Sequence, residues 1–440
     1  MLNVDITKRK KLLQVQTTFR HGSRTPMGSF GVGQYLTNFT KSEQDLSIFN
    51  SQLCQTNVYF PLSRNPINQT RVPRNYPGES TAPLPGGGLT GALTCIGMKQ
   101  ALRLGNELSA RYVGMDKLLP SSWSQAKRFL TTRSTYTKRT LATARGVLSG
   151  LYPDDAQSGT MSADIDLSGQ PEHQVFHRSS CNRLKQVFAT CMAKHVTDVS
   201  LEKIQAVLRD QTTQWSHADP MWEIISARDQ FACREAEGKP IPPEILAIDH
   251  ELNVAATLQM HHIFIGDGVL GQTEALKMAI GRMVTVIMDT MEKPDGKLHL
   301  YSGHDWTVTP LLLTACREKE EPAIHTWPPF CSNISFELWS DRDDDVRLNY
   351  WGTRGIQNHD QGRYVRTIYN SNVIDMPCSP RGEEYCTLRQ FRHMMNQYKS
   401  LDYNKECKEH FDGCPVVTLP GLSANHDDDK SAVEARPSSA

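Results

Sequence analysis

Three short apolar runs, each followed by a charged or histidine residue, constrain the fold of this 440-residue chain most strongly. Helical spacing of apolar residues follows two of them, over residues 96–113 and again up to about residue 151. Alternating strands and helices predict an α/β sheet, whose ligands bind beyond the carboxyl ends of the strands. We therefore expect the three strand ends to lie in one site. The runs are LLQVQTTF (12–19) before Arg20-His21, KRFLTT (127–132) before Arg133, and LHLYSG (298–303) before His304-Asp305.

The rest of the chain predicts a helical insertion in the sheet domain. Residues 180–295 read as mainly helical and charged, so we expect a cap over 153–295, between sheet-domain segments 11–152 and 296–410. A helix is predicted to open at Thr309-Pro310, because threonine suits the N-cap and proline the first helical position. Further predictions are a long irregular stretch at 28–92, strands at 332–340, 346–351 and 363–369, and a disordered tail at 421–440.

Composition excludes several classes of protein. Lys+Arg and Asp+Glu both number 48, so the formal net charge is zero and nothing indicates nucleic-acid binding. No apolar run reaches the roughly 18 residues of a membrane span, and the start, MLNVDITKRKK, shows no signal peptide. We expect a monomer that acts on a small molecule, with the cytoplasm as one of two expected locations. Among the 11 cysteines, a disulfide or two is possible in the C-terminal group Cys378, Cys386, Cys407 and Cys414.

The run FRHGSRTP, residues 19–26, has the chemistry of a phosphate site. Arg20 and Arg24 offer planar guanidiniums that match phosphate oxygens. His21 between them is neutral near physiological pH and can act as a covalent nucleophile. Gly22 permits close backbone approach, which lets a carbonyl orient the imidazole ring.

This run resembles the RHGxRxP signature of the histidine acid phosphatases, a branch of the histidine phosphatase superfamily. His304-Asp305 resembles the second signature of that family, and residues 89–105, 298–313 and 325–339 are similar to its other segments. The resemblance implies a phosphoglycerate-mutase-like sheet domain flanked by helices, with an inserted helical cap. It also implies a phosphohistidine at His21, no metal or other cofactor, and mitochondria as the second expected location. The implied phosphate ligands are Arg20, Arg24, Arg133 and His304, and the implied general acid is Asp305.

The proton on Asp305 sets the expected pH dependence. A general acid must be protonated when the substrate is bound. Arginines lower the pKa of a neighbouring carboxyl group, while a phosphate dianion raises it, so we expect best activity below neutrality.

Two residues that follow Arg133 in the sequence are not expected to take part in the phosphate chemistry. Arg139 is interpreted as a solvated or salt-bridged helix residue. Tyr136 replaces the usual Asp of the family, which affects substrate contacts only.

The leading hypothesis is a metal-independent acid phosphatase for lysophosphatidic acid or related lipid phosphates. A sugar or inositol phosphate substrate ranks lower, since the cap is mixed in charge. A metal-dependent phosphohydrolase built on His304-Asp305 lacks further spaced ligands, and we do not expect His261-His262 to bind metal. A non-catalytic phosphate-binding module needs neither His21 nor Asp305. Sensitivity to a chelator separates the metal-dependent alternative from the first.

Overall fold

The computed structural model describes most of the chain between Lys10 and Glu409. The described residues are 10–27, 38–60, 63–67, 83–168, 174, 181–193, 199–210, 220–265, 269–292, 297–317, 326–341, 362–400 and 402–409. The strand expected at 346–351 and the tail at 421–440 lie outside them.

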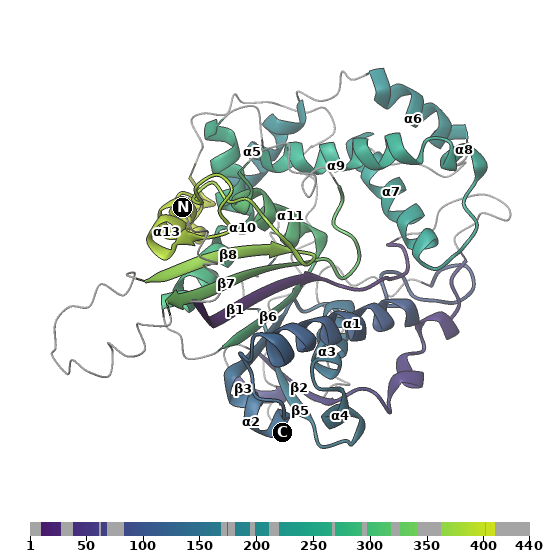
Figure 1. Ribbon diagram of the computed structural model, residues 1–440. Coiled ribbons are helices and arrows are strands. Elements are labelled where there is room, and N and C mark those ends of the chain that lie inside the picture. Colours follow the sequence, from purple (N-terminus) through teal and green to yellow (C-terminus); the bar gives the residue numbers. More distant parts are fainter. Residues whose placement is uncertain are drawn as a thin grey trace, which may run out of the picture.

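Ten strands in the described part form one mixed sheet (Figure 1). Its order is β10-β8-β7-β1-β6-β4-β5-β2-β3, with β9 paired to β8. The central strands β1, β6 and β4 run parallel, whereas β7 is antiparallel to β1. The bounds are β1 Lys10–Arg20, β2 Gln55–Phe60, β3 Ser63–Ile67, β4 Leu130–Ser134, β5 Ser162–Leu167, β6 Leu298–Gly303, β7 Asn333–Asp341, β8 Arg363–Tyr369, β9 Asn372–Val373 and β10 Cys386–Thr387.

The register of the central strands decides where the site lies. Arg20, the last residue of β1, pairs with Gly303, the last residue of β6, and Ser134 at the end of β4 pairs with Ser302. All six residues of β6 are buried, as expected for a parallel strand covered on both faces. The residues that follow β1, β4 and β6 therefore emerge together at one edge of the sheet.

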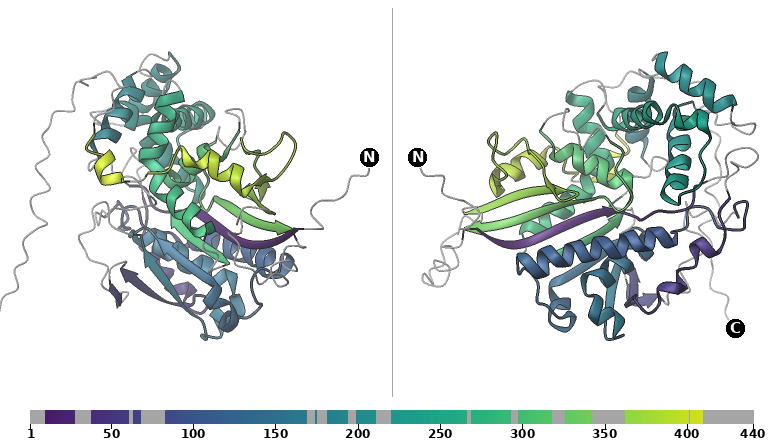
Figure 2. Two further views of the ribbon diagram at one scale, coloured as in Figure 1. Left: turned by 90° about the vertical axis from the view of Figure 1, so that its left-hand side faces the viewer. Right: turned by 45° about the vertical axis from the view of Figure 1, so that its right-hand side comes forward.

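Helices cover both faces of the sheet (Figures 1 and 2). On one face, α1 (Cys95–Leu108) and α3 (Lys138–Leu151) pack together against apolar side chains of β1 and β6, including Phe19 and Leu300. On the other face, α10 (Val269–Glu292), α11 (Asp305–Ala315) and α13 (Leu388–Asn396) pack against β7 and its neighbours. Alternation of side chains along each strand supplies both layers with apolar contacts.

A helical group rises above α10 and α11 in Figure 1. A disulfide joins Cys181 at the start of this group to Cys407, and a second joins Cys378 to Cys386. Three cysteines of the C-terminal group, Cys378, Cys386 and Cys407, are thus paired, one of them with a partner distant in sequence, and Cys414 lies outside the described residues. The helices of the group are α5 Asn182–Ala193, α6 Val199–Asp210, α7 Pro220–Ala236, α8 Pro243–Leu246 and α9 Asp249–Ile265. The remaining elements are η3 Ser42–Gln44, η4 Leu46–Phe49, η5 Ser109–Met115, α2 Trp123–Ala126, η6 Lys127–Phe129, α4 Pro153–Gln157 and α14 Tyr403–Glu406.

The structure corrects three details of the sequence prediction. Strand β5 lies in the segment expected for the helical cap, so the sheet extends to Leu167. Strand β2 lies in the segment expected to be irregular, next to β5. The helix predicted from Thr309 begins at Asp305 instead, because the side chain of Thr307 accepts a hydrogen bond from the His304 backbone and turns the chain at once. Pro310 therefore lies inside α11.

Candidate active site

His21 is the first residue after β1 and is buried. Its backbone N–H donates to the carbonyl of Gly303, 3.0 Å away, which ties the loop to the end of β6. Its ring Nδ1 lies 2.8 Å from the carbonyl oxygen of Gly22. Since a carbonyl oxygen only accepts, Nδ1 carries the proton and Nε2 keeps its lone pair. The ring is thus held in the tautomer that a nucleophile at Nε2 requires.

His304 faces His21 from the end of β6, with the ring centroids 5.4 Å apart. Nδ1 of His304 lies 3.4 Å from Nη2 of Arg139, and Nε2 lies 3.0 Å from the hydroxyl of Thr135. A guanidinium only donates, so Nδ1 accepts and Nε2 carries the N–H. The second histidine is therefore a hydrogen-bond donor at Nε2.

Arg20 and Arg24 bring two buried guanidiniums to the same place. Nη2 of Arg20 lies 2.9 Å from Oδ2 of Asp305, and its Nη1 donates to the carbonyl of Pro328 at 2.6 Å. Nη2 of Arg24 lies 2.8 Å from Oδ1 of Asp229 in α7. Within the described residues, the Nε–H of each arginine is shielded from solvent and has no hydrogen-bond partner. Buried N–H groups of this kind are suited to an oxyanion.

The electrostatics of the site keep both histidines neutral. Burial lowers the pKa of His21 well below its usual value, and the charges of Arg139, Arg20 and Arg24 lower it further. The pKa of His304 is also lowered, chiefly by burial and by Arg139. A neutral imidazole surrounded by cations can attack an electrophile that brings negative charge with it.

Asp305 is buried as the first residue of α11, where the helix dipole favours a carboxylate. Oδ2 accepts a hydrogen bond from Nε1 of Trp327 at 2.9 Å, and Oδ1 accepts from the backbone N–H of Trp306. Burial alone would raise the pKa of Asp305, but the charges of Arg20 and Arg24 and the Trp327 hydrogen bond hold it at about 2. Without substrate, the group is therefore a carboxylate.

The arginine contributed by the segment RSTYTKR is Arg139 rather than Arg133. Arg133 lies within β4, level with Tyr301 of β6, and its side chain is exposed. Arg139 lies in the first turn of α3, bonds to His304, and is the largest charge acting on His21. Our prediction chose the residue at the strand end, whereas the site takes its arginine from the helix that follows. Arg139, which the sequence analysis interprets as a solvated or salt-bridged helix residue, instead bonds to the buried ring of His304.

Helix α7 brings residues that the sequence analysis missed. Asp229 bonds to Arg24, and Sγ of Cys233 lies 3.6 Å from the same guanidinium. Just after the helix, Glu237 accepts hydrogen bonds from the hydroxyls of Ser23 and Thr94. Asp229, Cys233 and Glu237 are spaced four residues apart, which places them along one side of a helix, and this spacing is the only signal of them in the sequence.

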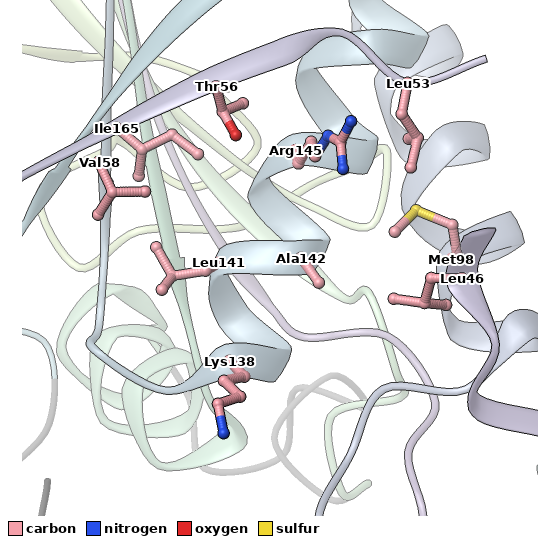
Figure 3. Close-up of a pocket in the computed structure, with 10 residues that line it drawn as sticks. All are labelled: Leu46, Leu53, Thr56, Val58, Met98, Lys138, Leu141, Ala142, Arg145 and Ile165. Atoms are coloured by element: carbon pink, nitrogen blue, oxygen red, sulfur yellow. The ribbon is translucent and has the colours of Figure 1, made fainter. Parts of the chain in front are cut away.

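A separate apolar cavity of about 200 Å³ lies beside α3 (Figure 3). Lys138 and Arg145 are its charged residues, whereas Arg139, between them in sequence, reaches His304. The cavity and the candidate site thus use different sides of α3. The cavity is lined by Leu46, Leu53, Thr56, Val58, Met98, Lys138, Leu141, Ala142, Arg145 and Ile165.

Two further features concern metals and membranes. Among the described residues, no three His, Cys, Asp or Glu side chains are grouped so that they could hold a metal ion. None of the described helices combines the length and the apolar character that crossing a bilayer requires.

Comparison with known proteins gives a family. The model of the histidine phosphatase superfamily, branch 2, matches residues 11–222 and 269–370. Lysophosphatidic acid phosphatase type 6 of Homo sapiens is 25% identical over 366 residues, which cover 79% of this chain and 78% of that protein. A probable acid phosphatase of Schizosaccharomyces pombe is 23% identical over 92% of this chain and 96% of its own length.

Solved structures share the fold. The phytase of Citrobacter braakii has a TM-score of 0.55 and 14% identity, over 90% of this chain and 99% of that one. A phytase of Hafnia alvei, in complex with tartrate, has a TM-score of 0.56 and 14% identity, over 90% and 98% of the two chains. Fold, family match and relatives define the class of protein, which is a phosphoric monoester hydrolase. The chain belongs to the histidine phosphatase superfamily, branch 2.

Proposed function

We propose that His21 takes the phosphoryl group from a phosphomonoester. Nε2 of His21 forms a bond to phosphorus as the ester P–O bond breaks, and protonated Asp305 gives its proton to the leaving oxygen. Water then attacks phosphorus, its proton returns to Asp305, and the N–P bond breaks. Arg20, Arg24, Arg139 and His304 donate hydrogen bonds to the phosphoryl oxygens. The observation that carries this proposal is the Nδ1–Gly22 hydrogen bond, which leaves Nε2 free among three guanidiniums.

Charge balance supports a substrate with a single phosphate. In the free enzyme, Arg20, Arg24, Arg139 and Arg228 supply four positive charges, and the carboxylates of Asp305 and Asp229 remove two of them. A phosphate dianion therefore balances the net charge of these groups. A polyphosphate would need a further cluster of cations, so an inositol polyphosphate ranks below a monophosphate.

Aromatic side chains beside Asp305 support an apolar leaving alcohol. Trp327, which bonds to Asp305, contacts Trp306 with ring centroids 6.3 Å apart, and Trp306 contacts Phe264 at 5.7 Å. Phe330, half-buried, lies 6.0 Å from the His21 ring. Aromatic rings thus lie on one side of the acid that protonates the leaving oxygen. We infer that the substrate is lysophosphatidic acid or a related lipid phosphate, in line with the name of the human relative.

The test compares wild type with His21→Ala on lysophosphatidic acid, p-nitrophenyl phosphate and myo-inositol hexakisphosphate, with a chelator present. We expect wild type to be active, His21→Ala to be inactive, and lysophosphatidic acid to have the highest kcat/KM. His250→Ala, at an exposed histidine of α9, is the matched control and should retain full activity. Activity in His21→Ala would overturn the assignment of His21 as the nucleophile. A preference for the hexakisphosphate would overturn the substrate class but not the mechanism.

A further inference from the structure

Arg228 is a buried cation of α7 that the phosphoryl-transfer steps do not use. It precedes Asp229, the partner of Arg24. Its Nε donates to Oδ1 of Asn253 at 3.1 Å, and the guanidinium carbon lies 4.7 Å from the centre of the Trp327 ring. Nη1 is shielded from solvent and, within the described residues, has no hydrogen-bond partner. An Asn and a Trp therefore fix the guanidinium plane while one of its N–H groups stays unused.

The position of Arg228 is on the general-acid side of the site. The ring that it stacks on, Trp327, donates to Oδ2 of Asp305, the oxygen that also faces Arg20. The acid meets the leaving oxygen of the substrate, so Arg228 lies next to the alcohol portion rather than next to the nucleophile. Burial, with the charge of Arg20, lowers the pKa of Arg228 to about 10, while Asp229 and Asp305 oppose that shift. The group is still a cation at the pH of any assay.

We propose that Arg228 determines specificity by donating a hydrogen bond from Nη1 to an oxygen on the alcohol portion of the substrate, close to the phosphate ester. This inference rests on the proposed function. The glycerol backbone of a lysophospholipid offers such oxygens, as a hydroxyl and an ester group. A simple alkyl phosphate offers none, and leaves the Arg228 N–H buried and unpaired. Sites that hydrogen-bond a substrate oxygen reject analogues that lack it, because the buried donor is then left without a partner.

A second phosphate is a poorer occupant of this position. The carboxylates of Asp229 and Asp305 already act on the Arg228 charge. A second dianion would therefore meet one partly compensated cation and two like charges. A neutral oxygen satisfies the N–H without that repulsion.

The experiment measures kcat/KM for glycerol 3-phosphate and n-propyl phosphate, which differ only in hydroxyl groups, in wild type and in Arg228→Met. We expect the variant to lose about 10- to 100-fold on glycerol 3-phosphate, as for one hydrogen bond to a charged group, and less than about 3-fold on propyl phosphate. Arg103→Met, at an exposed arginine of α1, is the matched control. Arg228→Lys, which keeps the charge, should recover part of the loss if the donor is what matters.

Several outcomes would contradict the proposal. An equal loss on both substrates would place Arg228 in phosphate binding or in support of Asp305. No loss on either substrate would show that Arg228 does not contact the substrate. Retained turnover of propyl phosphate shows that the phosphatase chemistry is intact, so failure of this inference is distinct from failure of the proposed function. If thermal unfolding shows that Arg228→Met is unfolded, kcat/KM of Arg228→Lys for the two substrates is the test. A larger loss on glycerol 3-phosphate than on propyl phosphate supports the proposal, and an equal loss contradicts it.

Discussion

Gly22 and Gly97 pack backbone against backbone, which fixes the loop that carries His21. A Cβ added at Gly22 would lie 2.8 Å from Cα of Gly97, and one added at Gly97 would lie 2.8 Å from the backbone nitrogen of Ser23. Real Cβ atoms do not approach other atoms so closely. The first turn of α1 thus supports the carbonyl of Gly22, which in turn orients the His21 ring.

Gly97→Ala is therefore expected to damage the site without touching a catalytic group. The methyl group must push the loop away from α1, and a shift of about 1 Å at a reacting group lowers rates by roughly 10²-fold. We expect kcat for p-nitrophenyl phosphate to fall by that order. Gly114→Ala is the matched control, because among the described residues a Cβ there meets a single atom within 4 Å, the backbone oxygen of Ser109 at 3.7 Å. If both variants keep full activity, the backbone contact does not position His21.

The two arginines of RSTYTKR give a second prediction. Arg139→Met removes a donor that bonds to His304 and acts on His21, so kcat/KM should fall roughly 10²- to 10³-fold. Arg133→Met removes an exposed side chain from β4 and should change kcat/KM by less than about 2-fold. Steady-state kinetics of the two variants under one set of conditions makes the comparison. The reverse ranking would restore Arg133 as the phosphate ligand.

This pair of residues shows what the sequence could predict. Local patterns were sufficient for β1, β6 and the residues directly after them, because a buried strand followed by a charged turn is visible within ten residues. Strands β1 and β6 are parallel neighbours that end level with each other, so the residues that follow them, His21 and His304, lie together at the same edge of the sheet. Arg133 was preferred because it directly follows a strand-like run. The geometry that excludes it depends on how far β4 extends, and strand boundaries are the least certain part of such a prediction.

Contributions from α7 could not be predicted in the same way. Asp229 and Glu237 reach Arg24 and Ser23 across more than 200 residues of chain. Nothing in the local sequence distinguishes these carboxylates from the solvated charges of an ordinary helix. Strand β2 was missed for a related reason: its residues QTNVYF lie in a polar segment, and its pairing with β5 is what makes it a strand.

The pKa of Asp305 predicts how the rate depends on pH. At a pKa of about 2, Asp305 carries no proton in the free enzyme at pH 5, so the catalytic proton must arrive with the substrate. The monoanion of a phosphomonoester supplies it below a pKa of about 6. We therefore expect kcat/KM for an alkyl phosphate to fall about tenfold per pH unit above that value, with no acidic limb near pH 4. A profile in which kcat/KM rises through pH 8 would contradict the conclusion that the substrate monoanion brings the catalytic proton.

Asp305→Asn tests the same group by its leaving-group dependence. An amide cannot protonate the leaving oxygen, so kcat/KM for an alkyl phosphate should fall by about 10²- to 10⁴-fold. p-Nitrophenolate leaves without a proton, so kcat/KM for p-nitrophenyl phosphate, which reports only the steps up to the phosphohistidine, should be affected much less. The ratio of the two rates is the measurement, since a structural defect lowers both rates alike. An unchanged ratio would exclude Asp305 as the acid.

The buried histidines predict a loss of stability in acid. His21 and His304 have pKa values below the unfolded value of about 6.5, so the unfolded chain binds more protons under pH 6.5. Their contribution is complete above pH 6.5 and declines as the pH falls, by up to about 1.4 kcal/mol per pH unit for each ring. Asp305 adds nothing in this window, because its own contribution is lost only below about pH 4.

Urea unfolding midpoints at pH 7.5, 6 and 5 measure this dependence. We expect the midpoint to fall steadily below pH 6.5 in wild type, and to fall less in His304→Gln, which cannot take up the proton. His250→Gln, at an exposed position, should keep the wild-type slope. Inorganic phosphate should offset part of the loss at pH 5, because binding to the folded state alone stabilises it. If His304→Gln and wild type show the same slope, groups other than the paired histidines control the acid stability.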